Sequence, residues 1–349
     1  MLHKEFELLR TISRMNLNPE ERERFINIVN DKEFIENQQS YLNVITRHKL
    51  QYLFYKHLYE NHLLLHHSIR ELSMILSERF YFLQSKHFEF TSELKKVVES
   101  LNSENVKYAI LKGISIADPL YMRGDLVYRN YNDIDILITK QDVNKVKKLL
   151  NDINFWQASV SETYDITNAE RKDLVFWSLN SHQEHKFIKP SSLFRLSPRF
   201  ILKIDINTTI FEGGKVEPRM PTVKLLDKCE TRKSIGIGSY YTLNKTFELI
   251  QLCFHFYKDT MYAEKRLRKE NIVLIKFCDI YEYIMSYYDL IDWDVFNLNI
   301  DRYNIRKEIE YVLSLVVDYY EDDTFSKLVN NCVKNMVLVE YSWDKLLDV

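Results

Sequence analysis

Apolar and polar residues alternate along residues 132–138, Asn-Asp-Ile-Asp-Ile-Leu-Ile. Successive residues of a β-strand point to opposite faces, so Asp133 and Asp135 are predicted to share one face and the isoleucines the other. Two carboxylates about 7 Å apart along a strand repel each other unless cations or a basic neighbour lie beside them. The pattern therefore predicts a strand whose polar face can bind a divalent metal ion.

A second alternating stretch covers residues 200–207, Phe-Ile-Leu-Lys-Ile-Asp-Ile-Asn. As a strand it places Lys203, Asp205 and Asn207 on one face and the apolar residues on the other. Two interpretations stay open. Asp205 joins the first two acids as a third carboxylate, or the stretch is a half-buried strand with one solvated face.

The apolar run Val106–Leu111 has the length of a buried strand and is followed by Lys112 and Gly113. A glycine permits a tight turn into a helix that begins near Ser115. Backbone N–H groups at such a helix start can bind a phosphate, and the Ser115 hydroxyl would add a donor. Most turns of this kind bind no ligand, so this prediction needs support from the rest of the chain.

Glycine and proline are concentrated in the middle of the chain. All six glycines and five of the six prolines lie between residues 113 and 238. Because Gly and Pro mark turns and break helices, the flanks are predicted to be helical and the middle to contain strands joined by turns. We expect an α+β protein with an N-terminal helical region at 1–100, an α/β core at 101–238 and a C-terminal helical domain at 239–349.

Several local signals predict individual helices. Asn18-Pro19-Glu20-Glu21 combines an N-cap residue, proline at the first helical position and acids in the first turn, so a helix should begin there. Further helices are expected over 91–101 and 143–153. One apolar helix face is predicted from the i, i+3/i+4 spacing of Leu72, Ile75, Leu76, Phe80 and Leu83.

Composition narrows the classes of function. The 349 residues are 46% hydrophobic, which allows a large core, and a net charge of −2 gives no global attraction for nucleic acid or an anionic membrane. The four cysteines form no C-x-x-C pair, which argues against a zinc knuckle or a disulfide framework. The chain has no apolar signal region at its start and no run long enough to span a bilayer. We therefore expect a soluble cytoplasmic protein.

Three other polar clusters are weaker candidates. For His66 and His67 a boundary between core and solvent is favoured over a metal site, because no acid or cysteine partner is nearby. The basic cluster Lys265–Lys269 is interpreted as a solvated helix face rather than a phosphate site. The segment His182–His185 lacks the spacing of zinc-binding motifs and is expected to form a loop near the active site.

An ordered set of motifs resembles the polymerase-β-like nucleotidyltransferase superfamily. The set comprises L-K-G at 111–113, Leu-Tyr at 120–121, Arg129, D-I-D at 133–135 and a separate Asp205. The resemblance is closer to an uncharacterised bacterial branch with L-K-G and R-x-x-x-D-I-D motifs. Three later stretches also resemble this branch, namely Leu252-Cys253-Phe254-His255, Lys276-Phe277-Cys278-Asp279 and Ile291-Asp292-Trp293. The resemblance implies a polymerase-β-like core with a mixed β-sheet, flanked by the two helical regions.

Two positions depart from the family pattern. The superfamily usually has Gly-Gly or Gly-Ser after the first strand, whereas Ile114 separates Gly113 from Ser115 here, which weakens phosphate binding by the serine. In the closer branch a histidine often follows the third acid by two residues, but here that residue is Asn207. A proton-shuttling role at this position is therefore weakened.

The resemblance implies catalysis by two metal ions. Asp133 and Asp135 would hold two Mg²⁺ ions, with Mn²⁺ as a substitute, and Asp205 would complete the second metal site. Asp205 could also accept the proton of the attacking hydroxyl.

The resemblance also implies a nucleotide-binding set, namely Lys112, Gly113, Ser115 and Arg129. Lys112 and Arg129 are the nearest cations that could balance phosphate charge. For Arg129 a salt bridge to one of the acids at 133–135 is an equally weighted alternative.

The implied function is transfer of an NMP from an NTP, with ATP as the favoured donor, to a hydroxyl of a small molecule, peptide or protein. The near-neutral charge disfavours a long nucleic acid as acceptor. A tRNA-modifying toxin-type nucleotidyltransferase stays open, since a local basic face would suffice, and so does a phosphotransferase of the same fold. The alternative of another class is a non-catalytic NTP-binding or scaffold protein. Three mutually repelling carboxylates argue against it, because an inactive protein has no need of them.

Overall fold

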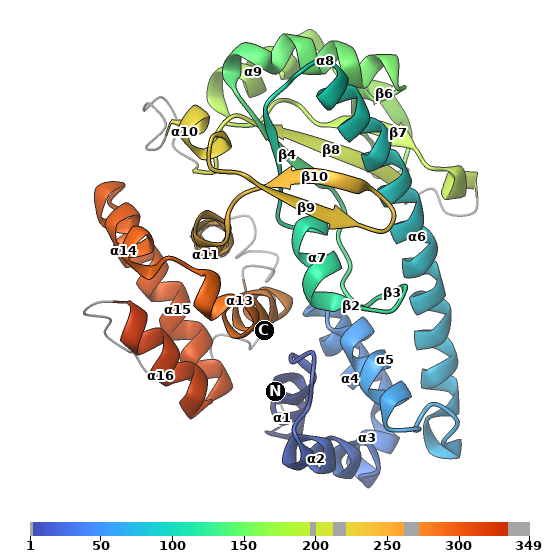
Figure 1. The fold of residues 1–349 in the computed structure, drawn as a ribbon. Coiled ribbons are helices and arrows are strands. Elements are labelled where there is room, and N and C mark those ends of the chain that lie inside the picture. Colours follow the sequence, from blue (N-terminus) through green and yellow to red (C-terminus); the bar gives the residue numbers. More distant parts are fainter. Residues whose placement is uncertain (1–2, 196–199, 212–220, 262–271, 334–349) are drawn as a thin grey trace. The chain divides into compact units, whose positions relative to one another are not determined.

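The computed structural model describes residues 3–195, 200–211, 221–261 and 272–333. The chain forms two compact units (Figure 1). The helical unit comprises Met1–Leu83, Leu120–Asn130 and Leu252–Val349, and the sheet unit comprises Gln84–Pro119 and Tyr131–Gln251. The expected α+β class is confirmed, whereas the division into three domains stays a prediction.

The helical unit brings together helices from both ends of the sequence. Helix α2 begins where the sequence predicts, because the Asn18 side chain accepts a hydrogen bond from the Glu21 N–H and the Glu21 carboxylate accepts one from the Asn18 N–H. The elements that lie wholly in this unit are α1 (His3–Ile12), α2 (Pro19–Val29), α3 (Lys32–Glu36), α4 (Gln38–Arg47), α5 (Gln51–Glu60), η1 (His67–Ile69), β2 (Met122–Arg123), β3 (Leu126–Val127), α13 (Ile275–Tyr287), η4 (Tyr288–Leu290), α14 (Trp293–Arg302), α15 (Arg306–Tyr320) and α16 (Asp323–Cys332).

Helix α6 (Arg70–Ser103) is one continuous element of 34 residues. The sequence predicts separate helices on either side of residue 90, but no glycine or proline interrupts the chain there, so the helix continues. Four residues of the predicted apolar face are buried, while Ile75 is exposed. Helices α6, α7 (Ile114–Tyr121) and α11 (Lys245–Met261) each contribute residues to both units.

The sheet unit contains a mixed eight-stranded sheet in the order β6-β5-β7-β8-β4-β1-β10-β9. The pairs β4–β8 and β1–β10 are parallel, and the other neighbours are antiparallel. The elements that lie wholly in this unit are β1 (Tyr108–Leu111), β4 (Ile134–Ile138), η2 (Lys140–Asp142), α8 (Val143–Asp152), β5 (Trp156–Val160), β6 (Ile166–Asn168), α9 (Arg171–Asn180), β7 (Phe187–Pro190), η3 (Ser192–Arg195), β8 (Ile201–Asn207), α10 (Thr222–Leu226), β9 (Glu230–Ser234) and β10 (Gly238–Thr242).

The three predicted strands form neighbouring strands in the middle of this sheet. β1, β4 and β8 all lie within the expected ranges, and Asp133 directly precedes β4. Along β8 the predicted alternation is confirmed, since Leu202, Ile204 and Ile206 are buried while Lys203 and Asp205 are half-buried. The apolar face of β4 and β8 therefore fixes which way the acids point.

Within the described ranges, every helix is too short or too polar to cross a membrane.

Candidate active site

Asp135 and Asp205 lie side by side on two parallel strands. The register of β4 and β8 pairs Asp135 directly with Asp205, so both side chains project from the same face of the sheet. Asp135 is only 2% exposed and Asp205 is half-buried. The second alternating stretch therefore does bring a third acid to the strand that carries the first two.

The shared environment raises the pKa of both carboxyls. Burial raises the pKa of Asp135 to about 6, with Lys112 opposing the shift and Asp133 adding to it. Burial and then the negative charge of Asp135 raise the pKa of Asp205 to about 7. Two carboxyls whose pKa values lie this close to neutrality can exchange a proton or bind a cation at physiological pH.

Lys112 supplies a positive charge beside these acids. Leu111 at the end of β1 pairs with Asp135, and Lys112 follows it in the turn where the strand ends. The Lys112 Nζ lies 3.2 Å from Asp135 Oδ2. Burial opposes the charge of Lys112, but Asp135 and then Asp133 raise its pKa above the ordinary value, so the group is an ammonium ion.

Two amide side chains, those of Gln183 and Asn207, form a row of hydrogen bonds that ends at the Asp135 carboxylate. Asn207 Nδ2 donates to Asp135 Oδ1 at 3.3 Å, and Gln183 Nε2 donates to Asn207 Oδ1 at 2.8 Å. The loop around Gln183 is tied to the end of β8, because the Thr208 N–H donates to the His182 carbonyl. The expectation that this loop lies near the acids is confirmed. Sequence reasoning missed Gln183, for which the only signal was its position between the two histidines of that loop.

The donor set suits a divalent cation, although the part of the chain that the structure describes contains no preformed metal site. Among the residues that the structure describes, no three His, Cys, Asp or Glu side chains form a group that could hold a metal ion. Asp135 Oδ2 is nevertheless buried and faces the Lys112 ammonium at 3.2 Å, so this oxygen already contacts a cation. Together with Asp133 and Asp205 it provides the carboxylate oxygens that Mg²⁺ prefers. The residues present therefore fit the ion chemically.

The predicted glycine turn is present, but Ser115 serves a different purpose. Gly113 has φ of +51°, a left-handed conformation that favours glycine, and α7 begins directly after it. Ser115 is fully buried, and its Oγ donates to Glu248 Oε1 at 2.9 Å. Arg232 Nη2 forms an ion pair with Glu248 at 2.9 Å. A buried carboxylate requires such donors, so the geometry favours a structural role for Ser115 over phosphate binding.

Replacing Ser115 with alanine should therefore lower stability and leave nucleotide affinity unchanged. Loss of a buried hydrogen bond to a charged group costs about 1.5–3 kcal/mol. Urea unfolding would measure the loss, and titration with Mg·NTP would measure the affinity. Weaker nucleotide binding without a loss of stability would restore the phosphate-binding interpretation.

Arg129 has a partner that the sequence analysis did not anticipate. In the helical unit its Nε and Nη2 donate to the two carboxylate oxygens of Asp279, each at 2.6 Å. The Tyr121 hydroxyl donates to Asp279 Oδ1 at 2.8 Å. Burial opposes the charge of Arg129, but Asp279 raises the pKa of the guanidinium above its usual range. Two donor groups of the Arg129 guanidinium thus bind the Asp279 carboxylate, which favours a structural role for Arg129 over phosphate binding.

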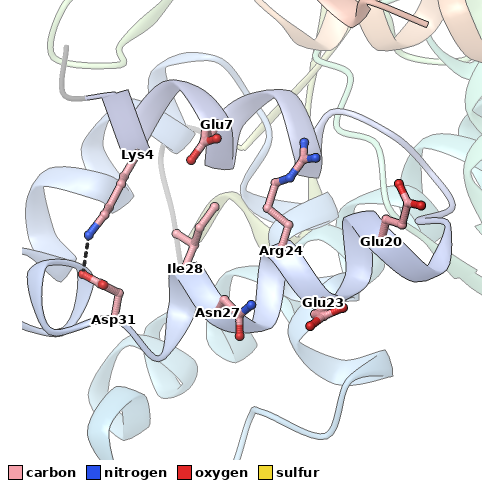
Figure 2. Close-up of a pocket in the computed structure, with 8 residues that line it drawn as sticks. All are labelled: Lys4, Glu7, Glu20, Glu23, Arg24, Asn27, Ile28 and Asp31. Carbon is pink, nitrogen blue, oxygen red and sulfur yellow. Dashed lines mark ion pairs between the residues drawn. The ribbon is translucent and has the colours of Figure 1, made fainter.

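The weaker candidates add no chemistry to this site. His66 and His67 are exposed and lie in the sequence between buried Leu63 and buried Ile69, in agreement with their interpretation as a boundary between core and solvent. The cluster Lys265–Lys269 lies outside the described residues. A hollow of about 360 Å³ in the helical unit is lined mainly by charged side chains of α1 and α2. Figure 2 shows these side chains and the ion pair between Lys4 and Asp31. None of the predicted site residues lines that hollow.

A mixed sheet with acids on neighbouring strands, within an α+β protein, is consistent with a nucleotidyltransferase-type fold. A family model described as "Uncharacterised nucleotidyltransferase" matches residues 36–321, and the chain belongs to that family. A comparison with curated proteins found no match. The family resemblance predicted from the motifs is thereby confirmed, and membership implies an NTP as substrate. The finer polymerase-β-like assignment stays a prediction.

Proposed function

We propose that the protein is a Mg²⁺-dependent nucleotidyltransferase that moves an NMP from an NTP to a hydroxyl of a small molecule, peptide or protein. The observation that supports this most strongly is the direct pairing of Asp135 with Asp205 on parallel strands. Neighbouring carboxylates on a sheet destabilise each other, and such an arrangement is expected where a cation and a phosphate are to be bound.

Each polar residue of the site then has a role in the reaction. Lys112 offsets negative charge at Asp135, and its ammonium can bind phosphate oxygens. Asp205, whose pKa burial raises to about 7, can accept the proton of the attacking hydroxyl near neutral pH. Asn207, itself held by Gln183, donates to Asp135 and fixes the orientation of that carboxylate.

Asp133, Asp135 and Asp205 are the residues that would hold Mg²⁺. The ion would offset charge on the triphosphate and stabilise the entering and leaving oxygens.

Mg²⁺-dependent nucleotide binding can be tested without knowing the acceptor. Thermal unfolding would be recorded for the wild type and for the Asp133→Asn/Asp135→Asn double variant with ATP, GTP, CTP or UTP, in Mg²⁺ and in EDTA. A nucleotide at 100 times its dissociation constant should stabilise the wild type by about 2.7 kcal/mol, and the double variant should lose this gain. If no nucleotide shifts the transition, the non-catalytic scaffold alternative would be favoured.

A further inference from the structure

Two lysines next to Asp205 have no role in the proposed reaction. Phe187, the first residue of β7, pairs with Ile204, which is the neighbour of Asp205 in β8, and Lys186 directly precedes β7. Burial is the largest effect on the pKa of Asp205 and raises it, whereas the positive charge of Lys186 lowers it, so this ammonium lies close to the carboxyl. Lys203 lies two residues before Asp205 on the same face of β8.

Neither ammonium group has a counter-ion within the described residues. Lys186 and Lys203 are both half-buried, and neither side chain forms an ion pair or a hydrogen bond there. Glu184 is the acid nearest to Lys186 in the sequence, but its Oε2 is paired with Lys147 Nζ at 2.6 Å. Partial burial withdraws an ammonium group from water, and a bound anion would offset this cost.

Lys112 and Lys186 approach the acids from opposite sides. The strands run in the order β7-β8-β4-β1, so Asp205 and Asp135 lie between the lysine that precedes β7 and the lysine that follows β1. Lys112 contacts Asp135 at 3.2 Å, whereas Lys186 lies next to Asp205. In the proposed reaction Lys112 binds phosphate oxygens of the NTP, and Asp205 accepts the proton of the attacking hydroxyl. Lys186 is therefore on the side of the site to which the acceptor binds.

We propose that Lys186 and Lys203 bind an anionic group of the acceptor, so that the acceptor carries a phosphate or a carboxylate close to the hydroxyl that is modified. The inference rests on the proposed function, because it takes Asp205 as the residue to which that hydroxyl is directed. Ammonium groups form charge-assisted hydrogen bonds with phosphate and carboxylate oxygens. A neutral acceptor would leave both lysines without a counter-ion.

Glycerol 3-phosphate can probe this site, because it carries a phosphate beside free hydroxyls and glycerol is its uncharged counterpart. Calorimetric titrations would use the full-length protein with Mg²⁺ and the α,β-methylene analogue of the NTP that stabilises the wild type. The analogue fills the donor site and cannot transfer its NMP group. Glycerol 3-phosphate should bind to this complex at millimolar concentration, and glycerol should not.

Removing the charge of Lys186 should weaken the binding of glycerol 3-phosphate. Lys186→Met keeps the aliphatic chain and should raise the dissociation constant about 10–100-fold, the range expected for a lost hydrogen bond to a charged group. Lys186→Arg keeps the positive charge and should retain most of the affinity. Lys148→Met removes an exposed lysine of α8 and should bind the probe as the wild type does. All three variants should bind the NTP analogue with unchanged affinity, which also shows that they fold.

The same titrations can overturn the inference. It is wrong if glycerol 3-phosphate does not bind to the wild-type complex, or if it binds equally well to Lys186→Met. Weaker binding of the NTP analogue to Lys186→Met would assign this lysine to the donor phosphates instead of the acceptor. Each of these results leaves nucleotide binding by the wild type intact. If no nucleotide binds to the wild type, the proposed function fails, and the inference fails with it.

Discussion

Replacing Asp135 with asparagine should lower turnover by about 10²–10³, the loss seen when a key electrostatic group is removed from an active site. Asp135 is the most buried of the three acids, and Lys112, Asn207 and Asp205 all lie against it or beside it. An amide of the same shape keeps the packing but cannot offset the charge of a cation. Turnover would be measured as pyrophosphate release from the NTP that stabilises the wild type, with an acceptor found by screening.

A matched control separates this loss from a general effect of the substitution. Asp125→Asn makes the same chemical change at an exposed position between β2 and β3 and should leave turnover unchanged. Near-normal turnover in Asp135→Asn would refute the assignment of Asp135 to the reaction.

The Asp135→Asn variant should also be at least as stable as the wild type at pH 8. Because burial raises the folded-state pKa of Asp135 to about 6, the folded protein binds more protons than the unfolded chain between pH 4 and 6. The free energy of unfolding of the wild type therefore falls as pH rises through that window. Asparagine at position 135 does not titrate, so the variant does not show this fall. The advantage of the variant should disappear near pH 4. A variant that unfolds more easily at pH 8 would mean that Asp135 contributes to stability rather than opposing it.

The strands and the acids could be predicted because side chains alternate on a strand. The isoleucines of β4 and β8 must be buried, and this requirement alone puts Asp135 and Asp205 on the opposite face. The parallel register that places these two acids side by side depends on the order of strands in the sheet. No local pattern in the sequence specifies that order.

The partners of individual charged residues could not be predicted for the same reason. The glycine turn before Ser115 predicts a phosphate contact, but the Ser115 hydroxyl donates to Glu248, which lies 133 positions further along the chain. Arg129 is separated from Asp279 by 150 positions. Both long-range partners are buried carboxylates, and burial of a charge requires a donor from wherever the fold provides one. The spacing of residues in the sequence predicts the face of a strand or helix on which a side chain lies. It does not predict which distant residue contacts that side chain.

Removing the charge of Arg129 should destabilise the protein by about 3–5 kcal/mol, because it leaves the carboxylate of Asp279 buried without its counter-ion. Asp279 is 3% exposed, and Arg129 donates two hydrogen bonds to it while Tyr121 donates a third. Arg129→Met keeps most of the side-chain volume and removes the charge. Denaturant unfolding would give the loss of stability, and Mg·NTP titration of the folded fraction would give the affinity.

The double variant Arg129→Met/Asp279→Leu distinguishes a structural pair from a phosphate-binding arginine. A buried ion pair replaced by apolar residues of similar volume is often tolerated, so the double variant should be more stable than Arg129→Met alone. A coupling energy of about 0.5–3 kcal/mol is expected for residues in direct contact. If Arg129→Met instead retained wild-type stability and lost nucleotide affinity, its main role would be at the phosphates. The structural interpretation predicts a large loss of stability and little change in nucleotide affinity, because two donors of the guanidinium are already directed at Asp279.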